Sequence, residues 1–251
     1  MNIIKTDLLS KIAFIDHGFF NRKGGQSSGA FESLNVGFDK GDDDKNVKKN
    51  REIIAANFNI PVSNLITLNQ VHGDTVHVID SENINKYKFS SSKQALSNSG
   101  DAIITDQNNL LIGVVTADCA PILLCDEYAK IIAVIHAGWR GALGNIIENT
   151  IKELESKKCK HIVASIGPCI QKKSFFIENA MSDKIEKKYI SYFYGKVFFD
   201  MQLLILEKLM QLGVKTVSKI NIDTFSNNDF FSCRRQNGKY GVQFSGIIIK
   251  E

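Results

Sequence analysis

The sequence lacks most of the features that mark secreted, fibrous or membrane-spanning chains. It holds 3 prolines and no Pro-rich or Gly/Ser-rich linker, so nothing divides its 251 residues into separate units. No apolar run approaches the roughly 20 residues that cross a bilayer. The first residues carry Lys5, Asp7 and Lys11 and lack the apolar core of a signal peptide. We therefore expect a single domain, residues 1–251, in the cytoplasm and without a membrane partner.

The 5 cysteines are an odd number and lack the spacing of a disulfide framework. Thiols stay reduced in a cytoplasmic protein, where they are free to bind a metal or to act as nucleophiles.

The net charge of +4 is small, and lysines alternate with acids along the chain. A protein that binds long nucleic acid usually carries a concentrated basic stripe. The sequence therefore argues against a nucleic-acid partner, while a small anionic substrate remains compatible with the mild positive charge.

Short β-branched runs alternate with a few amphipathic helices, a pattern typical of mixed sheets with helices outside them. Helices are expected over Asp44–Phe58, along the apolar stripe Leu143–Leu154, and from a cap at Asp200 to Leu212. Residues 90–99 are rich in serine and are expected to form a loop. We therefore predict an α+β fold whose mixed β-sheets pack against outer helices. The expected strands are Leu65–Leu68, Thr75–Ile79, Ala102–Thr105, Leu111–Thr116, Ile122–Cys125, Ile131–Ile135, Ile162–Ile166, Val197–Phe199, Lys219–Ile222, Phe230–Cys233 and Ile247–Ile249.

Three side chains with metal-binding chemistry stand where strands end or turn. Cys119 and His136 each follow a buried strand, and His72 lies in a polar turn between two strands. Two imidazoles and one thiolate supply the three ligands of a catalytic zinc and leave one position open. This donor set favours zinc or copper over magnesium or calcium. The spacing alone does not distinguish such a site from ordinary structural histidines.

Other residues are candidates for substrate contacts. Arg140 lies in a Gly-bracketed turn, Gly138 to Gly141, before a helix expected near Ala142, and this turn is either an anion site or a tight turn. Arg51 falls on the apolar face of its helix, so it either snorkels to solvent or points into the site. Asp118 is either a general acid or base, or a cap of the turn before Cys119.

At these motifs the sequence resembles the YfiH family, also called laccase-domain or polyphenol-oxidase-like proteins, which is associated with purine nucleoside phosphorylase activity. The resemblance covers nearly the whole chain. It rests on HGFFNRKGG (residues 17–25), SLNVG (33–37), NR (50–51), NQVHG (69–73), GDA (100–102), TADCAP (116–121), HAGWRG (136–141), GPCI (167–170) and FSCRR (231–235).

The resemblance implies that His72, Cys119 and His136 bind zinc, with copper as the alternative metal. It implies phosphorolysis of adenosine, inosine and methylthioadenosine, with adenosine deamination as a second activity. We expect Asp118 to move a proton, Arg140 or Arg51 to bind phosphate, and Asn35 and Gln70 to position the substrate. The partners are then purine nucleosides and phosphate, and the chain is expected to be a monomer or a small homo-oligomer.

Three alternatives remain open at this point. Copper-dependent phenol oxidation is reported for the family, although four-electron oxygen reduction normally uses several coppers. Cys119 with His136 would also suit a thiol hydrolase, and a metal without turnover would indicate a binding module. The chain departs from the family pattern at Phe175 and Phe176, Asp223-Thr224 and Tyr240-Gly241-Val242, where Tyr-Glu, Cys-Thr and Thr-Gly-Arg are usual.

Overall fold

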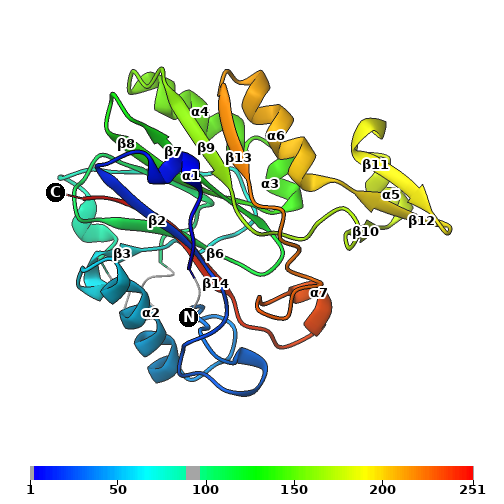
Figure 1. The fold of residues 1–251 in the computed structure, drawn as a ribbon, viewed down its shortest axis with the longest axis horizontal. Helices are drawn as coiled ribbons and strands as arrows, with labels where there is room; N and C mark the ends of the chain where they lie inside the picture. The colour runs from blue at the N-terminus through cyan, green and yellow to red at the C-terminus, as the bar shows by residue number, and fades with distance from the viewer. Residues whose placement is uncertain (1–2, 89–96, 251) are drawn as a thin grey trace.

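The strands form three sheets in the computed structural model, which describes residues 3–88 and 97–250 (Figure 1). The five-stranded sheet has the order β1 (Ile3–Ile4), β2 (Ile15–Phe20), β14 (Gln243–Ile249), β6 (Leu111–Thr116) and β3 (Leu65–Ile66). The six-stranded sheet has the order β13 (Thr216–Lys219), β9 (Ile162–Ile166), β7 (Ala120–Asp126), β8 (Ile131–Ala137), β5 (Ala102–Thr105) and β4 (Val76–Ile79). A small sheet consists of β10 (Phe176–Ile177), β12 (Lys196–Phe199) and β11 (Ile190–Phe193).

Both large sheets mix parallel and antiparallel pairs, which confirms the predicted α+β fold with mixed sheets. In the six-stranded sheet, β9 with β13 and β4 with β5 are parallel, and the central pairs are antiparallel. The loop predicted over 90–99 lies outside the described residues for 90–96. The domain count stays a prediction.

Two of the longer helices begin at a capping aspartate. Asp43 and Asp200 cap the two helices that follow them, where their carboxylates accept the N–H groups of Lys45 and Leu203. No helix among the described residues is long and apolar enough to span a membrane. The helices are α1 (Asp7–Ser10), α2 (Asp44–Asn57), α3 (Trp139–Leu143), α4 (Ile146–Ser156), α5 (Asn179–Ser182), α6 (Met201–Gln211) and α7 (Cys233–Gln236).

The two large sheets pack face to face, and helices cover their outer faces (Figure 1). Successive side chains of a strand point to opposite faces, so Ile132 and Val134 of β8 join the core between the sheets, while Ile135 packs toward α4 and α6. Ile54 of α2 belongs to a third apolar cluster on the outer face of the five-stranded sheet. The order of layers is therefore helix, sheet, sheet, helix.

Two predicted strands are wrong, and four observed strands, β1, β2, β10 and β11, are missing from the prediction. The chain at Lys219–Ile222 has only its first residue in a strand, because β13 ends at Lys219. The segment Phe230–Cys233 is buried by side-chain packing without strand pairing, and Ser232 then caps α7. Strand β2 was not predicted because His17 and Gly18 interrupt its apolar pattern.

His17 is a buried base whose ring accepts a backbone hydrogen bond. It is 1% exposed, and its Nε2 accepts the N–H of Thr6 at 2.9 Å. Burial lowers the pKa of His17 from 6.5 to about 4, because a charged imidazolium is poorly solvated inside the protein. The folded state therefore favours the neutral ring.

We predict that acid weakens the fold through His17. The contribution of the neutral ring is fully present above pH 6.5 and is lost as the pH falls towards 4. Urea unfolding of wild type should lose up to roughly 3 kcal/mol more than His17→Gln across this window. Parallel pH profiles for the two proteins would contradict the prediction.

Candidate metal centre

Two strand ends and one loop bring His72, Cys119 and His136 together. Cys119 directly precedes β7, His136 lies near the end of β8, and β8 pairs His136 with Pro121 of β7. His72 arrives from the loop between β3 and β4. The ligand atoms of all three lie within 4.8 Å of one another, and their exposure ranges from exposed His72 to buried His136. The structure thus brings together the three residues that the sequence singled out.

The carboxylate of Asp101 holds two of these residues in place. Asp101 is 1% exposed and precedes β5. It accepts the backbone N–H groups of His72 at 3.0 Å and Gly73 at 2.7 Å, and it accepts the Nδ1–H of His136 at 2.7 Å. This last bond leaves Nε2 of His136 as the nitrogen that can bind a metal. A carboxylate in this position is the usual outer partner of a metal-binding histidine.

The backbone around the three side chains is constrained. His72 has a φ of 59° and Asp118 a φ of 92°, a left-handed region that side chains other than glycine rarely adopt. Gly138 passes so close that an added Cβ would lie 2.3 Å from Nδ1 of His72 and 3.1 Å from Sγ of Cys119. Only a glycine therefore fits at position 138 while both of these side chains keep their places.

The protonation of the two histidines differs. Partial burial lowers the pKa of His72, and the neighbouring His136 lowers it further, which favours its neutral ring. Burial also acts to lower the pKa of His136, but Cys119 and Asp101 outweigh it and raise that pKa to about 9. The acidic groups around His136 attract a proton, and a divalent cation would satisfy the same attraction.

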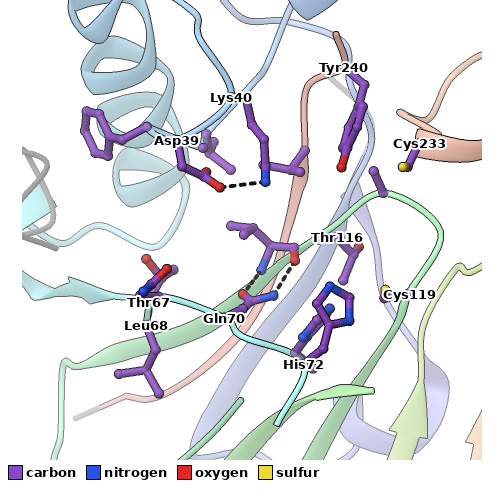
Figure 2. Close-up of a pocket in the computed structure, with 18 of the residues that line it drawn as sticks. Asp39, Lys40, Thr67, Leu68, Gln70, His72, Thr116, Cys119, Cys233 and Tyr240 are labelled. Carbon is purple, nitrogen blue, oxygen red and sulfur yellow. Dashed lines mark hydrogen bonds and ion pairs between the residues drawn. The ribbon is translucent and has the colours of Figure 1, made fainter. Parts of the chain in front are cut away.

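A cleft of about 150 Å³ opens beside the three residues, with Lys40 and Tyr240 on one side and Gln70 and His72 opposite (Figure 2). We call this the polar cleft. Thr116 also lines it, and its hydroxyl is buried without a hydrogen-bond partner. The residues of its wall are Val36, Gly37, Phe38, Asp39, Lys40, Arg51, Thr67, Leu68, Asn69, Gln70, His72, Val115, Thr116, Ala117, Cys119, His136, Cys233, Tyr240 and Val242.

Arg51 of α2 lines the polar cleft and is only 2% exposed. Its guanidinium donates to the carbonyl of Val36 at 3.0 Å and to the hydroxyl of Thr67 at 2.8 Å, while its buried Nε has no partner. Burial lowers its pKa to about 10, and no carboxylate among the described residues pairs with it. A buried cation without an acid is rare, so this side chain can still hold an anion.

Two residues expected to act on the substrate have their polar atoms engaged within the protein. The carboxylate of Asp118 accepts hydrogen bonds from the hydroxyls of Thr224 and Ser232 and from the N–H of Arg234. The amide of Gln70 lines the polar cleft but is bonded on both sides to the backbone of Val115, at 2.7 Å each. The predicted proton transfer by Asp118 and substrate contact by Gln70 stay predictions, and both geometries favour a positioning role.

Arg140 and Asn35 are not among the residues that wall the polar cleft. The helix α3 begins at Trp139, earlier than expected, so Arg140 is exposed in its first turn and its guanidinium stacks over the Trp139 ring at 4.3 Å. Asn35 is fully buried, and its amide bonds to Asp42 at 2.9 Å and to the N–H of Val242 at 3.0 Å. Asn35 therefore organises the loop that bears Lys40.

Several residues of the site were not assigned a role from the sequence. Asp101 stands in the Gly-Asp-Ala motif just before a buried strand, and an acid at such a strand end is the one signal that could have indicated it. Thr67 carried no such signal. Thr116 and Tyr240 lie in segments that the family comparison singled out, 116–121 and 240–242, but no role for their hydroxyls follows from the sequence.

Comparisons of the sequence and of the structure with known proteins indicate the same family. Residues 16–250 match the family model described as multi-copper polyphenol oxidoreductase laccase. A purine nucleoside phosphorylase from Corynebacterium glutamicum is 31% identical, over 92% of each chain. The purine nucleoside phosphorylase YlmD of Bacillus subtilis is 29% identical, over 93% of this chain and 88% of its own. The crystal structure of YlmD from Geobacillus stearothermophilus superposes with a TM-score of 0.88 at 25% identity, covering 96% of this chain and 93% of that one.

We predict that Asp101→Asn weakens metal binding roughly 10- to 100-fold, the usual effect of losing an outer carboxylate. Zinc affinity measured by competition with a chromophoric chelator checks this. Asp74→Asn, an exposed residue of the loop that carries His72, serves as the matched control and should bind like wild type. Equal affinities in all three proteins would show that Asp101 does not tune the site.

Proposed function

Since this chain belongs to the family that the multi-copper polyphenol oxidoreductase laccase model describes, we propose that it is a metal-dependent purine nucleoside phosphorylase. Its substrates are inorganic phosphate and adenosine, inosine or methylthioadenosine. The observation that carries the proposal is the buried, acid-free guanidinium of Arg51, which shares the polar cleft with His72, Cys119 and His136. The names of relatives that cover nearly the whole chain support it.

The donor set fits zinc, with copper as the alternative. Two imidazoles and a thiolate are ligands that zinc prefers, and because Asp101 bonds to Nδ1 of His136, Nε2 would be the nitrogen that holds the metal. When bound, zinc supplies a Lewis acid that polarises an oxygen of the substrate.

The presence of a single candidate metal site among the described residues argues against copper-dependent oxygen reduction as the main activity. Within residues 3–88 and 97–250, His72, Cys119 and His136 are the one group of three or more His, Cys, Asp or Glu residues close enough to share an ion. Four-electron reduction of oxygen normally uses several coppers. Phenol oxidation is therefore at most a side activity of this chain.

Arg51 binds the phosphate in this proposal, in preference to Arg140. The Arg51 guanidinium is preorganised by Val36 and Thr67, and its burial strengthens a charge-assisted hydrogen bond to an anion. Lys40 lines the same cleft, but its ammonium is paired with the carboxylate of Asp39 at 2.6 Å, so among the described residues of the cleft wall Arg51 is the cation without an acidic partner. Arg140 is exposed and does not wall the polar cleft among the described residues.

The reaction is a transfer of the ribosyl group from purine to phosphate. One phosphate oxygen forms a bond to C1′ of the ribose while the bond from C1′ to N9 of the purine breaks. The electron pair stays with the purine, which takes up the proton released by dihydrogen phosphate or a proton from water. Arg51 holds the attacking phosphate, and the unpartnered hydroxyl of Thr116 is available to a ribose hydroxyl.

The proposal is tested by phosphate-dependent release of hypoxanthine from inosine. We predict that Cys119→Ala and His136→Ala each lower kcat/KM at least 100-fold, the loss expected when a metal that lowers the barrier by several kcal/mol is removed. Cys125→Ala, a buried thiol of the neighbouring strand β7, is the matched control and should keep its activity. Wild-type rates in either folded variant would defeat the proposal.

Two further measurements separate the alternative activities. Activity that survives chelation and is abolished by iodoacetamide would identify a thiol hydrolase. Conversion of adenosine to inosine without phosphate would identify deamination, in which a water molecule attacks the purine.

Phosphate binding by Arg51 gives a separate prediction. Arg51→Met should raise the KM for phosphate roughly 10- to 100-fold, the effect of one lost hydrogen bond to a charged group, and should leave the KM for inosine nearly unchanged. Lys48→Met, an exposed residue of the same helix, is the control. An unchanged KM for phosphate in a folded Arg51→Met protein would move the anion site elsewhere.

A further inference from the structure

A second cavity, of about 210 Å³, shares a wall with the polar cleft. His72, Ala117, Cys119 and Cys233 line both spaces and therefore form the boundary between them. In Figure 2, Cys119 and Cys233 lie along one edge of the polar cleft. The three-residue metal centre thus stands between two cavities.

The second cavity has apolar and aromatic walls, and we call it the apolar chamber. Trp139, Ile170, Phe175 and Met201 line it beyond the shared boundary. Phe175 and Met201 belong to the core beneath α6, so these walls are firmly packed, while Trp139 is only partly buried.

The charged groups at the apolar chamber are already engaged. Of its described lining residues, Asp118 and Arg234 carry charge. The carboxylate of Asp118 accepts three hydrogen bonds. The Arg234 guanidinium lies 5.5 Å from the centre of the Phe175 ring and donates to the carbonyl of Phe176 at 2.9 Å. The walls that a ligand meets are therefore mostly apolar and aromatic.

We propose that the apolar chamber is the subsite for the purine base, opposite the phosphate in the polar cleft. The inference rests on the proposed phosphorolysis. A nucleophile and a leaving group occupy opposite sides of the sugar carbon in a direct displacement, and the two cavities lie on the two sides of the His72 and Cys119 boundary. A ribose at the metal centre would then place its base among Trp139 and Phe175.

The chemistry of the walls suits a heteroaromatic ring. Bases stack favourably on aromatic side chains irrespective of their exocyclic groups, and the thioether of Met201 adapts to rings of different outline. With its charged side chains engaged, the chamber discriminates weakly between a 6-oxo and a 6-amino group. Hypoxanthine and adenine should therefore bind with affinities within about tenfold of each other.

Trp139 is the single tryptophan of the chain, so its fluorescence reports directly on the apolar chamber. Titration of the whole protein with hypoxanthine should quench this emission saturably, and inorganic phosphate alone should not. In Phe175→Leu the dissociation constant should rise about tenfold, as expected for one lost base–aromatic contact. Phe193→Leu, on exposed β11, makes the same change far from the chamber and should bind like wild type.

A second variant covers the case in which Phe175→Leu does not fold. Trp139→Phe changes a partly buried side chain and should raise the KM for inosine severalfold while leaving the KM for phosphate unchanged. Phosphorolysis without quenching by hypoxanthine, or with equal affinities in wild type and Phe175→Leu, would overturn the base subsite but leave the function intact. Saturable quenching without phosphorolysis would confirm a purine site and refute the proposed reaction.

Discussion

The whole site depends on one buried carboxylate. Asp101 receives N–H groups from the loop that carries His72 and from the ring of His136, which belongs to the neighbouring strand β8. Burial alone would raise the pKa of Asp101, but His136 and the loop N–H groups lower it, so the group is ionised inside the protein. One negative charge therefore fixes both the conformation of a strained loop and the orientation of a ring.

The arrangement of the two large sheets explains why Cys119, the third candidate ligand, lies close to the two histidines. The turn before Cys119 carries the chain from β6 of the five-stranded sheet to β7 of the six-stranded sheet. At this turn the carboxylate of Asp118 accepts hydrogen bonds from the hydroxyl of Ser232 and from the backbone N–H of Arg234, at the start of α7. The polar cleft and the apolar chamber both adjoin this crossing, because Ala117 and Cys119 line both of them.

Much of this could be predicted from the sequence. The helices with clear caps were found because local chemistry decides them, and the buried central strands were found because both of their faces are apolar. Phe231 was misread because it is buried against Phe20 and Phe244 without strand pairing, and periodicity cannot distinguish the two. The three candidate metal ligands followed from their types and from the family resemblance, and Arg51 from its place on an apolar helix face. The bonds that engage Gln70 and Asn35, and the role of Asp101, depend on contacts between segments distant in sequence, which no local pattern encodes.

The position of Arg51 has a consequence for the protein as a whole. Its helix α2 packs on the outer face of the five-stranded sheet and buries a positive charge that no acidic side chain among the described residues balances. A ligand that binds only the folded chain stabilises it in proportion to the logarithm of its concentration. If Arg51 binds phosphate as proposed, orthophosphate would act as a counter-charge for the architecture, and the free energy of unfolding would rise with the phosphate concentration.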